Sequence, residues 1–450
     1  MNPSAARSSR ARRALLPLLW LFVWSPGLGA QERPTSAQDS LRVELQRLAV
    51  LVDSLRAEVN RLQGEGKTEE AQDPLAALRA AAAAAAAAAS GGAPPATEAP
   101  ATQEFVGRGR SLQAMNPEIS LTGDIFAQVM KDQTNRDNYF AREFEMSIIS
   151  NLDPFSRAKI FMARHDHGGE LTPFGDPEEE PGEGFAVEEG YVEWVSLPGG
   201  VGLKVGRFYQ QLGQLNRWHS HAFPFQSRSL PSLTFIGEEP LAQTGASMRW
   251  LLPVGGKAGT YTATLETTRS SNETLYGTST RPSLLANLNA FWQISDATDL
   301  DLSTTWTGGR YEDDNILLSR NLYAAEMSFT WSPPARTKYR GLNVRAGVMV
   351  LDGLLDPDGA PIDGTAKGVW TMAETKLNQS WLLGGRFDWT QNPHDVNQTA
   401  WLVSPTLTWW QSEYVRIRGE YDLLGRSDFR DGRFLLQATF SMGPHKHETY

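Results

Sequence analysis

The chain has 450 residues, no cysteine and a formal net charge of -10. A chain without cysteine forms no disulfide and carries no cysteine-linked lipid, and the negative charge argues against nucleic acid as a partner. Its 14 Trp, 11 Tyr and 19 Phe are many for a chain whose mean hydropathy is -0.38. Membrane β-barrels place such residues in aromatic girdles at both membrane interfaces.

Residues 1–30 have the layout of a secretory signal peptide. The apolar stretch Ala14–Trp24 is too short to span a bilayer, and it follows a basic region containing Arg7, Arg10, Arg12 and Arg13. Small residues from Pro26 to Ala30 provide a cleavage site before Gln31. We therefore expect export by the general secretory route, and no later apolar run is long enough to predict a membrane helix.

Residues 31–64 are predicted to form a periplasmic coiled coil. Within residues 39–63, apolar positions recur in alternating steps of four and three, at Leu41, Leu45, Leu48, Val52, Leu55, Val59 and Leu62. This spacing is the a/d seam of a coiled coil, although a single amphipathic helix lying on the barrel or on a partner would show it too. The segment would either reinforce an oligomer or make a contact with peptidoglycan or another periplasmic partner.

Residues 65–114 are predicted to be a linker. They contain the alanine run from Ala81 to Ala89, then Gly, Pro and Thr residues that end any helix. Such a composition is typical of a flexible tether without chemistry of its own.

Residues 115–450 alternate apolar and polar side chains between regularly spaced turn signals. From Arg433 to Met442, for example, Phe434, Leu436 and Phe440 share one face, and Gln437 shares the other with polar neighbours. Period two predicts strands. A transmembrane antiparallel β-barrel needs this pattern, because one face of each strand meets lipid and the other lines a watery lumen.

About sixteen strands are predicted, and the even number suits a bacterial barrel. They begin near residues 117, 139, 155, 184, 201, 239, 258, 283, 299, 319, 340, 366, 380, 399, 413 and 432. Short inner turns alternate with longer outer loops, which we expect at residues 166–183, 212–238, 270–282, 352–365 and 391–398. The third outer loop, residues 212–238, is too aromatic to lie in solvent, so we expect it to fold back into the lumen.

With this strand number, loop alternation, large third loop and aromatic C-terminus, the region 115–450 resembles the sixteen-stranded outer-membrane porins, most nearly the phosphate-selective porin-like superfamily. In that family the third loop forms the constriction of the pore. The resemblance implies that the narrowest point lies at a group of residues in this loop: Arg217, Trp218, His219, His221 and Arg228.

Charged residues that alternate with apolar neighbours in the strands are expected to face water in the lumen. They are Glu143, Glu145, Lys204, Arg249, Arg345, Arg386, Arg416 and Arg418. Rings or clusters of such charges set ion preference. Because both signs are present, a transverse field across the constriction and a lumen without sharp selectivity both remain open.

Six of the seven histidines occur in three H-x-H pairs: His165/His167, His219/His221 and His445/His447. In extended backbone residues i and i+2 point the same way, which suits two imidazoles on one metal. The first two pairs are predicted to converge on Zn²⁺ or a similar cation near the pore entrance. Pore lining or packing is the alternative role. The third pair belongs at the periplasmic end.

The sequence predicts a trimeric outer-membrane porin for passive diffusion of small hydrophilic solutes or ions, surrounded by outer-membrane lipid. It contains no G-x-S-x-G, no cysteine nucleophile, no glycine-rich phosphate loop and no H-E-x-x-H, so an enzyme is not expected. Two alternatives remain. One is a metal-binding outer-membrane protein that captures or takes up zinc through its histidine loops, and the other is a structural barrel that anchors the coiled coil.

Overall fold

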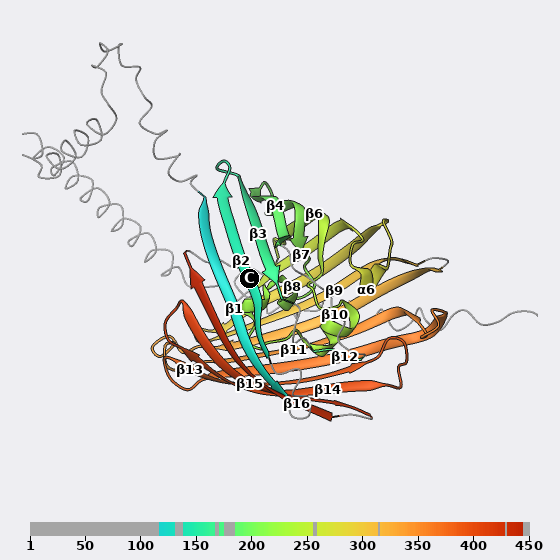
Figure 1. Cartoon of the computed structure of the whole chain (residues 1–450). Coiled ribbons are helices and arrows are strands. Elements are labelled where there is room, and N and C mark those ends of the chain that lie inside the picture. Colours follow the sequence, from blue (N-terminus) through green and yellow to red (C-terminus); the bar gives the residue numbers. More distant parts are fainter. Residues whose placement is uncertain are drawn as a thin grey trace, which may run out of the picture. The chain divides into compact units, whose positions relative to one another are not determined.

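The computed structural model describes residues 117–130, 138–166, 171–174, 185–254, 259–313, 316–427 and 430–443, which together form a β-barrel (Figure 1). The predicted signal peptide, coiled coil and linker lie outside these residues, as do His167, His445 and His447. In the described part of the chain, no helix is long and apolar enough to cross a membrane.

Sixteen strands make up the barrel, and the predicted starts agree with them closely. The largest difference is at β12, which begins at Pro361 instead of residue 366. The strands are β1 Glu118–Met130, β2 Asn138–Asn151, β3 Ser156–His165, β4 Phe185–Leu197, β5 Val201–Tyr209, β6 Ala242–Leu251, β7 Thr260–Arg269, β8 Pro282–Ser295, β9 Thr298–Asp313, β10 Ile316–Trp331, β11 Leu342–Leu355, β12 Pro361–Lys376, β13 Trp381–Gln391, β14 Thr399–Trp410, β15 Val415–Arg426 and β16 Arg430–Met442.

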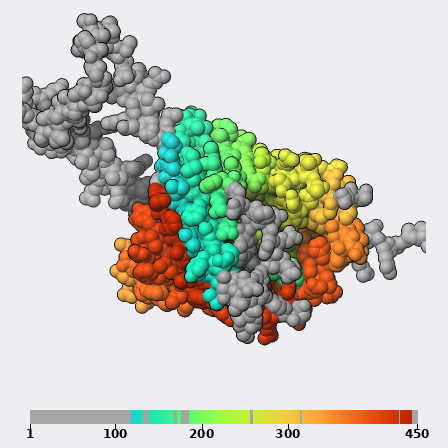
Figure 2. All heavy atoms as spheres, in the orientation of Figure 1, coloured from blue at the N-terminus to red at the C-terminus, as the bar shows by residue number. Residues whose placement is uncertain are grey.

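The sheet is antiparallel throughout and closes on itself. Each strand pairs with its neighbours in sequence, and β1 also pairs with β16, with Leu121 opposite Met442 and Met130 opposite Arg433. The cyan strand β1 accordingly lies beside the red strand β16, both in the ribbon and in the space-filling view (Figures 1 and 2). A closed sheet leaves no edge strand with unpaired backbone groups, and the predicted barrel is confirmed.

The alternation of side chains has the predicted orientation. In β16, Phe434 and Leu436 are 48% and 51% exposed on the outer wall, whereas Leu435 and Gln437 are 0% and 2% exposed inside. Exposed apolar residues recur on the outer wall of the other strands too, for example Leu383 and Leu407. An apolar belt around a closed barrel is the surface that a lipid bilayer requires.

One of the predicted outer loops is much shorter in the structure. Residues 352–365 are not a long outer loop, since β11 extends to Leu355 and leaves only residues 356–360 to connect it to β12. The carboxylate of Asp356 accepts hydrogen bonds from the backbone N–H groups of Asp358 at 3.0 Å and Ala360 at 2.7 Å. An aspartate that binds its own turn in this way stabilises a tight reversal, which is why a Gly- and Asp-rich stretch here is a hairpin.

The third outer loop joins β5 to β6 and folds into the lumen, as predicted. Its residues 210–241 contain the short helices η3 (Leu215–Arg217), η4 (Ser220–Ala222) and α5 (Leu230–Phe235), and α5 contacts β11, β12, β13 and β14. Outside this loop, the short helix α6 (Glu273–Tyr276) lies between β7 and β8 and contacts β9. We call residues 210–241 the third loop below.

Candidate constriction site in the lumen

Apolar side chains seat the third loop against the inner wall of the barrel. Trp218 and Phe225 of the loop pack with Trp370 and Met372 of β12, and Leu230 packs in a second cluster against β14 and β15. Phe225 and Leu230 are 1% and 0% exposed. Each fully buried apolar side chain of this size stabilises the contact by about 1.5–3 kcal/mol, so the loop has a fixed position in the lumen.

Strand arginines hold the backbone of the third loop. Arg416 donates to the carbonyl oxygen of His221 at 2.6 Å, and Arg418 donates to that of Phe223 at 2.8 Å. Hydrogen bonds from charged donors are stronger than those between neutral groups. The loop backbone is therefore bound from the wall, in addition to its apolar packing.

The prediction that strand charges face water in the lumen is wrong for five of the eight residues. Glu143, Glu145, Arg386, Arg416 and Arg418 point inward as the alternation requires, but they are buried. The third loop covers them and supplies partners in place of water. A buried charge is tolerated only with such partners.

The other three predicted lumen charges have different surroundings. Arg249 and Arg345 line a cavity that the third loop also lines. The guanidinium of Arg345 lies 4.8 Å from the ring centroid of Trp218. The ammonium of Lys204 lies 4.3 Å from the ring centroid of Tyr191. Such cation–π contacts keep a cation beside the wall.

A β-bulge in β2 directs two consecutive residues into the lumen. The register between β1 and β2 shifts between Asp124 and Phe126, and both Arg142 and Glu143 are buried on the inner side. Arg142 forms an ion pair with Asp124 and donates to the carbonyl oxygen of Ser220 at 3.0 Å. Bulges commonly re-aim a side chain in this way, and the residue becomes a clamp on the third loop.

A second bulge, in β4, does the same for Glu188 and Glu189. In the pairing of β3 with β4, Phe161 opposes Glu189 and Met162 opposes Val187, so Glu188 is the extra residue. Glu188 and Glu189 are 7% and 6% exposed. Period-two reasoning missed Arg142, Glu188 and Glu189. The one feature of the sequence that could have revealed these bulges is the presence of adjacent charged residues in otherwise alternating strands.

His219 lies at the centre of a group of carboxylates from β2 and β4. Its Nδ1 atom is 2.6 Å from Oε2 of Glu145 and 2.8 Å from Oε2 of Glu188, and its Nε2 atom is 3.6 Å from Oε1 of Glu189. The centroid of its ring lies 4.7 Å from that of Phe161 and 4.7 Å from that of Tyr209. The imidazole is thus held in one orientation.

His221 and His165 contact different carboxylates. Nδ1 of His221 is 3.0 Å from Oε1 of Glu143, and Nε2 of His165 is 2.6 Å from Oε1 of Glu188. His165 and His219 are therefore bridged by Glu188. The extended backbone assumed for His219 and His221 is interrupted by η4, and their rings stack 6.0 Å apart, each facing its own carboxylate.

The carboxylates raise the pKa of both loop histidines. Burial lowers the pKa of His219, but Glu145, Glu188 and Glu189 more than offset this and hold its pKa well above the usual range. For His221, burial again lowers the pKa, and the charges of Glu143 and Glu145 shift the balance upward. Acidic neighbours thus favour a positive charge at this point of the loop.

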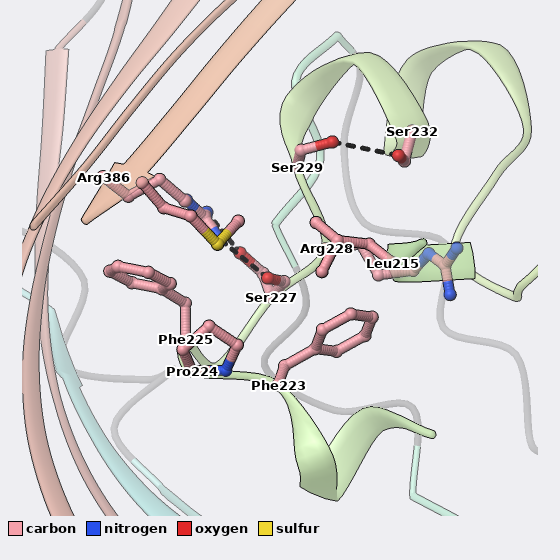
Figure 3. A pocket seen from close by; sticks show the side chains of 10 residues that line it. Leu215, Phe223, Pro224, Phe225, Ser227, Arg228, Ser229, Ser232 and Arg386 are labelled. Atoms are coloured by element: carbon pink, nitrogen blue, oxygen red, sulfur yellow. Dashed lines mark hydrogen bonds between the residues drawn. The ribbon is translucent and has the colours of Figure 1, made fainter. Parts of the chain in front are cut away.

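Arg228 and Arg386 are among the residues that line a small cavity between the third loop and the barrel wall (Figure 3). Nη2 of Arg228 donates to Oδ1 of Asn216 at 2.9 Å, and burial lowers the pKa of Arg228. Arg386 reaches in from β13 and donates to the carbonyl oxygen of Ser227 at 2.7 Å and to its hydroxyl at 2.8 Å. Figure 3 shows the bond from Arg386 to the Ser227 hydroxyl, which joins β13 to the loop. It also shows the bond between the hydroxyls of Ser229 and Ser232, which lies within the loop.

The third loop lies between two cavities. The inner one has a volume of 630 Å³ and is lined by Arg217 and Trp218 of the loop and by polar strand residues such as Asp301. The outer one has a volume of 250 Å³ and is lined by Leu233 and Glu238 of the same loop. Of the predicted constriction residues, Arg217 and Trp218 thus line the inner cavity, and Trp218 is largely buried there. His219, His221 and Arg228 are buried and do not line that cavity.

No family model matches the chain. Over 72 residues it is 39% identical to an uncharacterized protein of Aquifex aeolicus (strain VF5), and the match covers 16% of this chain and 15% of that protein. The similarity therefore spans a small part of either chain, and it does not indicate the class of protein.

Three solved structures share the architecture of the barrel. OprB of Pseudomonas putida, at high pH, is 10% identical, with 75% of this chain and 96% of that chain covered and a TM-score of 0.51. The anion-selective porin from Comamonas acidovorans is 8% identical, with 73% and 99% covered and a TM-score of 0.51. A loop L8 deletion mutant of OmpT, an outer membrane protein of Vibrio cholerae, is 8% identical, with 73% and 100% covered and a TM-score of 0.50. The described residues between 117 and 443 thus share the fold of the sixteen-stranded porins.

Proposed function

We propose that this protein is an outer-membrane porin through which small hydrophilic solutes or ions diffuse. The observation that carries the proposal is the third loop, which narrows a closed barrel between two cavities. An apolar outer wall and a largely polar inner wall suit a barrel that lies in lipid and contains water.

Within this proposal, the third loop is the constriction, with its residues in two roles. Arg217 and Trp218 form the inner mouth, since both line the 630 Å³ cavity. His219, His221 and Arg228 fix the shape of the loop from within, because their side chains are buried against charged and polar partners.

The charge around the inner cavity is mixed. The cavity is lined by three arginines and two aspartates: Arg217, Arg249, Arg345, Asp299 and Asp301. We expect a transverse field across this part of the lumen in place of a single-sign ring. Phosphate selectivity, which the resemblance to the phosphate-selective superfamily implies, would depend on the three arginines.

The remaining parts of the chain complete the proposal. Residues 1–30 direct export, residues 31–64 form a periplasmic coiled coil, residues 65–114 tether it, and residues 115–450 form the barrel in the outer membrane. The porin assembles as a homotrimer, and the coiled coil either reinforces the trimer or contacts peptidoglycan. The heptad of leucines in residues 39–63 supports this arrangement.

Conductance across a planar lipid bilayer tests the function. Purified protein should give discrete current steps, and the reversal potential in a salt gradient should report the sign of selectivity, with phosphate compared against chloride. Arg345→Glu should shift the reversal potential toward cation preference, because Arg345 lines the inner cavity. Folded protein that inserts but gives no steps would overturn the assignment.

A second candidate is a structural barrel that anchors the coiled coil. The observation in its favour is the apolar packing of the third loop, in which Leu212, Phe235 and Ile236 join a core with the inner wall of the barrel. In this function the packed loop closes the lumen and blocks the passage of solutes and ions. Absence of current steps from inserted protein would support this function over the porin.

The metal-binding alternative depends on His165, His167, His219 and His221. Of these, His167 lies outside the described residues, and His165 and His219 both contact Glu188. Zinc capture or uptake by these loops therefore involves carboxylates as well as imidazoles.

A further inference from the structure

Four side chains from three segments place possible metal ligands around one point of the lumen. Glu143 and Glu145 come from β2, Glu188 from β4 and His219 from the third loop. One ligand atom of each lies within 4.8 Å of all the others, and all four residues are buried. Two ligands on opposite sides of one ion, each at about 2.0–2.4 Å, stand about 4–5 Å apart, so the spacing fits a single cation.

Local backbone geometry explains why the carboxylates converge. Glu143 and Glu145 are two residues apart in β2 and therefore share its inner face. Glu188 is the extra residue of the bulge in β4, which turns it inward beside Glu189. Because β3 pairs with both β2 and β4, it sets the distance between these carboxylates. No single strand contains the whole group of ligands.

The surroundings of Glu145 provide an independent indication that a cation binds at this group of side chains. The Glu145 side chain is 0% exposed, its Oε1 atom accepts no hydrogen bond, and its Oε2 atom lies against Nδ1 of His219. Nδ1 of His219 lies 2.6 Å from it but is hydrogen-bonded to Glu188 at 2.8 Å. One imidazole N–H cannot serve two carboxylates. Glu145 therefore shares its donor with Glu188, and an under-satisfied buried carboxylate is costly, which a cation would relieve.

We infer that Glu143, Glu145, Glu188 and His219 form a binding site for one divalent transition-metal cation, with Zn²⁺ or Mn²⁺ as the best fit. The imidazole nitrogen suits Zn²⁺ and the three carboxylate oxygens suit Mn²⁺, whereas Cu⁺ prefers sulfur. Mg²⁺ and Ca²⁺, which prefer an all-oxygen shell, fit less well.

The supporting contacts match those of a metal site. His219 packs against Phe161 and Tyr209, and its Nδ1 is directed toward Glu145 and Glu188. On the opposite side of the ring, Glu189 lies 3.6 Å from Nε2 and would accept its proton. A ligating histidine usually donates its other N–H to a carboxylate, which sets the tautomer and the ring orientation.

Such an ion would join the third loop to the barrel wall. It would link β2 and β4 to the loop at His219, two residues from the carbonyl oxygen of His221 that Arg416 holds. If the proposed porin function holds, the cation fixes the constriction, and its removal loosens the loop. The binding itself does not depend on that function.

Isothermal titration of the purified full-length protein with Zn²⁺, after dialysis against EDTA, tests the site. The titration uses a parent in which His445 and His447 are changed to alanine, so that this pair does not compete. We expect one ion per chain. Glu145→Gln should weaken the binding by about tenfold or more, since loss of an outer-shell partner alone costs 10–100-fold.

Two controls make the result interpretable. Glu266→Gln, at another buried glutamate of the inner wall, bonded to Ser247, should leave the affinity unchanged. Glu145→Gln itself should fold, because it replaces a buried, under-satisfied carboxylate with a neutral amide of the same shape, and circular dichroism checks this. Equal affinity of the parent and folded Glu145→Gln, or no binding by the parent, would overturn the site. The metal-free conductance tests the porin separately.

Discussion

Gly213 is the residue at which the entry into the third loop turns. Its φ of +66° is in the left-handed region, and an added Cβ would lie 2.1 Å from the carboxylate carbon of Glu326. That carboxylate accepts a hydrogen bond from the N–H of Gln214 at 2.6 Å. Glycine is therefore required both by the backbone conformation and by the close approach of the barrel wall.

Gly213→Ala should lower the free energy of unfolding by about 2–4 kcal/mol. About 1–2 kcal/mol comes from the left-handed conformation, and the rest comes from displacing Glu326. Urea unfolding in detergent micelles, followed by tryptophan fluorescence, measures the loss.

Gly199→Ala is the matched control for this substitution. Gly199 also has a left-handed φ, +81°, but an added Cβ would meet nothing within 4 Å. Its alanine variant should lose only the conformational part. If both variants lose the same amount, the close approach of Glu326 to Gly213 has no energetic consequence.

At the scale of elements, helix α5 of the third loop is seated against β12. An added Cβ at Gly368, which faces the lumen, would lie 2.6 Å from Cβ of Pro231 at the start of α5. The absence of a side chain at Gly368 therefore lets the helix approach the wall. Leu230 then packs in its apolar cluster, and its N–H bonds to Oδ2 of Asp388 at 2.8 Å.

Gly368→Ala should displace α5 and lower the free energy of unfolding by about 1–3 kcal/mol, the usual cost of an overpacked contact. It should also expose the peptide bond after Arg228 to trypsin, because Arg228 is buried while the loop is seated. Limited digestion of the folded protein, followed by mass spectrometry, detects the cleavage.

Gly385→Ala provides the comparison for this experiment. Gly385 lies in the next strand, β13, where it is exposed and an added Cβ meets nothing within 4 Å. This variant should keep its stability and its resistance to trypsin. Resistance of Gly368→Ala as well would show that α5 tolerates the added methyl group and that its seat is looser than described.

At the scale of the whole molecule, the barrel is closed by its own hydrogen bonds. The pairing of β1 with β16 joins residues more than 300 positions apart, such as Met130 and Arg433. The barrel therefore does not need residues 31–114 to close its sheet. Any contribution of the predicted coiled coil should appear in assembly instead.

Deletion of residues 31–114 should leave the conductance of a single barrel unchanged but lower the temperature at which the oligomer dissociates. The reason is that a leucine seam buries its apolar side chains only between chains. Gel mobility of unheated and heated samples in mild detergent measures the dissociation.

A deletion of the alanine run alone, residues 81–89, is the control, because it shortens the predicted tether and keeps the heptads. It should dissociate at the parental temperature. If the larger deletion also leaves that temperature unchanged, the segment does not hold the subunits together, and the role at peptidoglycan becomes the better proposal.

The sequence by itself determined the barrel, the approximate strand starts and the inward fold of the third loop. These properties are local: period-two alternation assigns each strand two faces, and an aromatic loop such as Trp218–Phe225 cannot remain in water without cost. The interval between turn signals then sets the strand number.

Only the tertiary structure decided what the third loop contacts and which charges it covers. Bulges place Arg142 and Glu188 inward against the alternation, and the 3-10 turn η4 separates the directions of His219 and His221. The bond from Arg416 to His221 joins residues 195 positions apart. Side-chain periodicity carries no information about a one-residue insertion in the pairing or about such distant contacts. The contacts of the third loop with the wall and the carboxylate group around His219 therefore emerge only when the chain is folded.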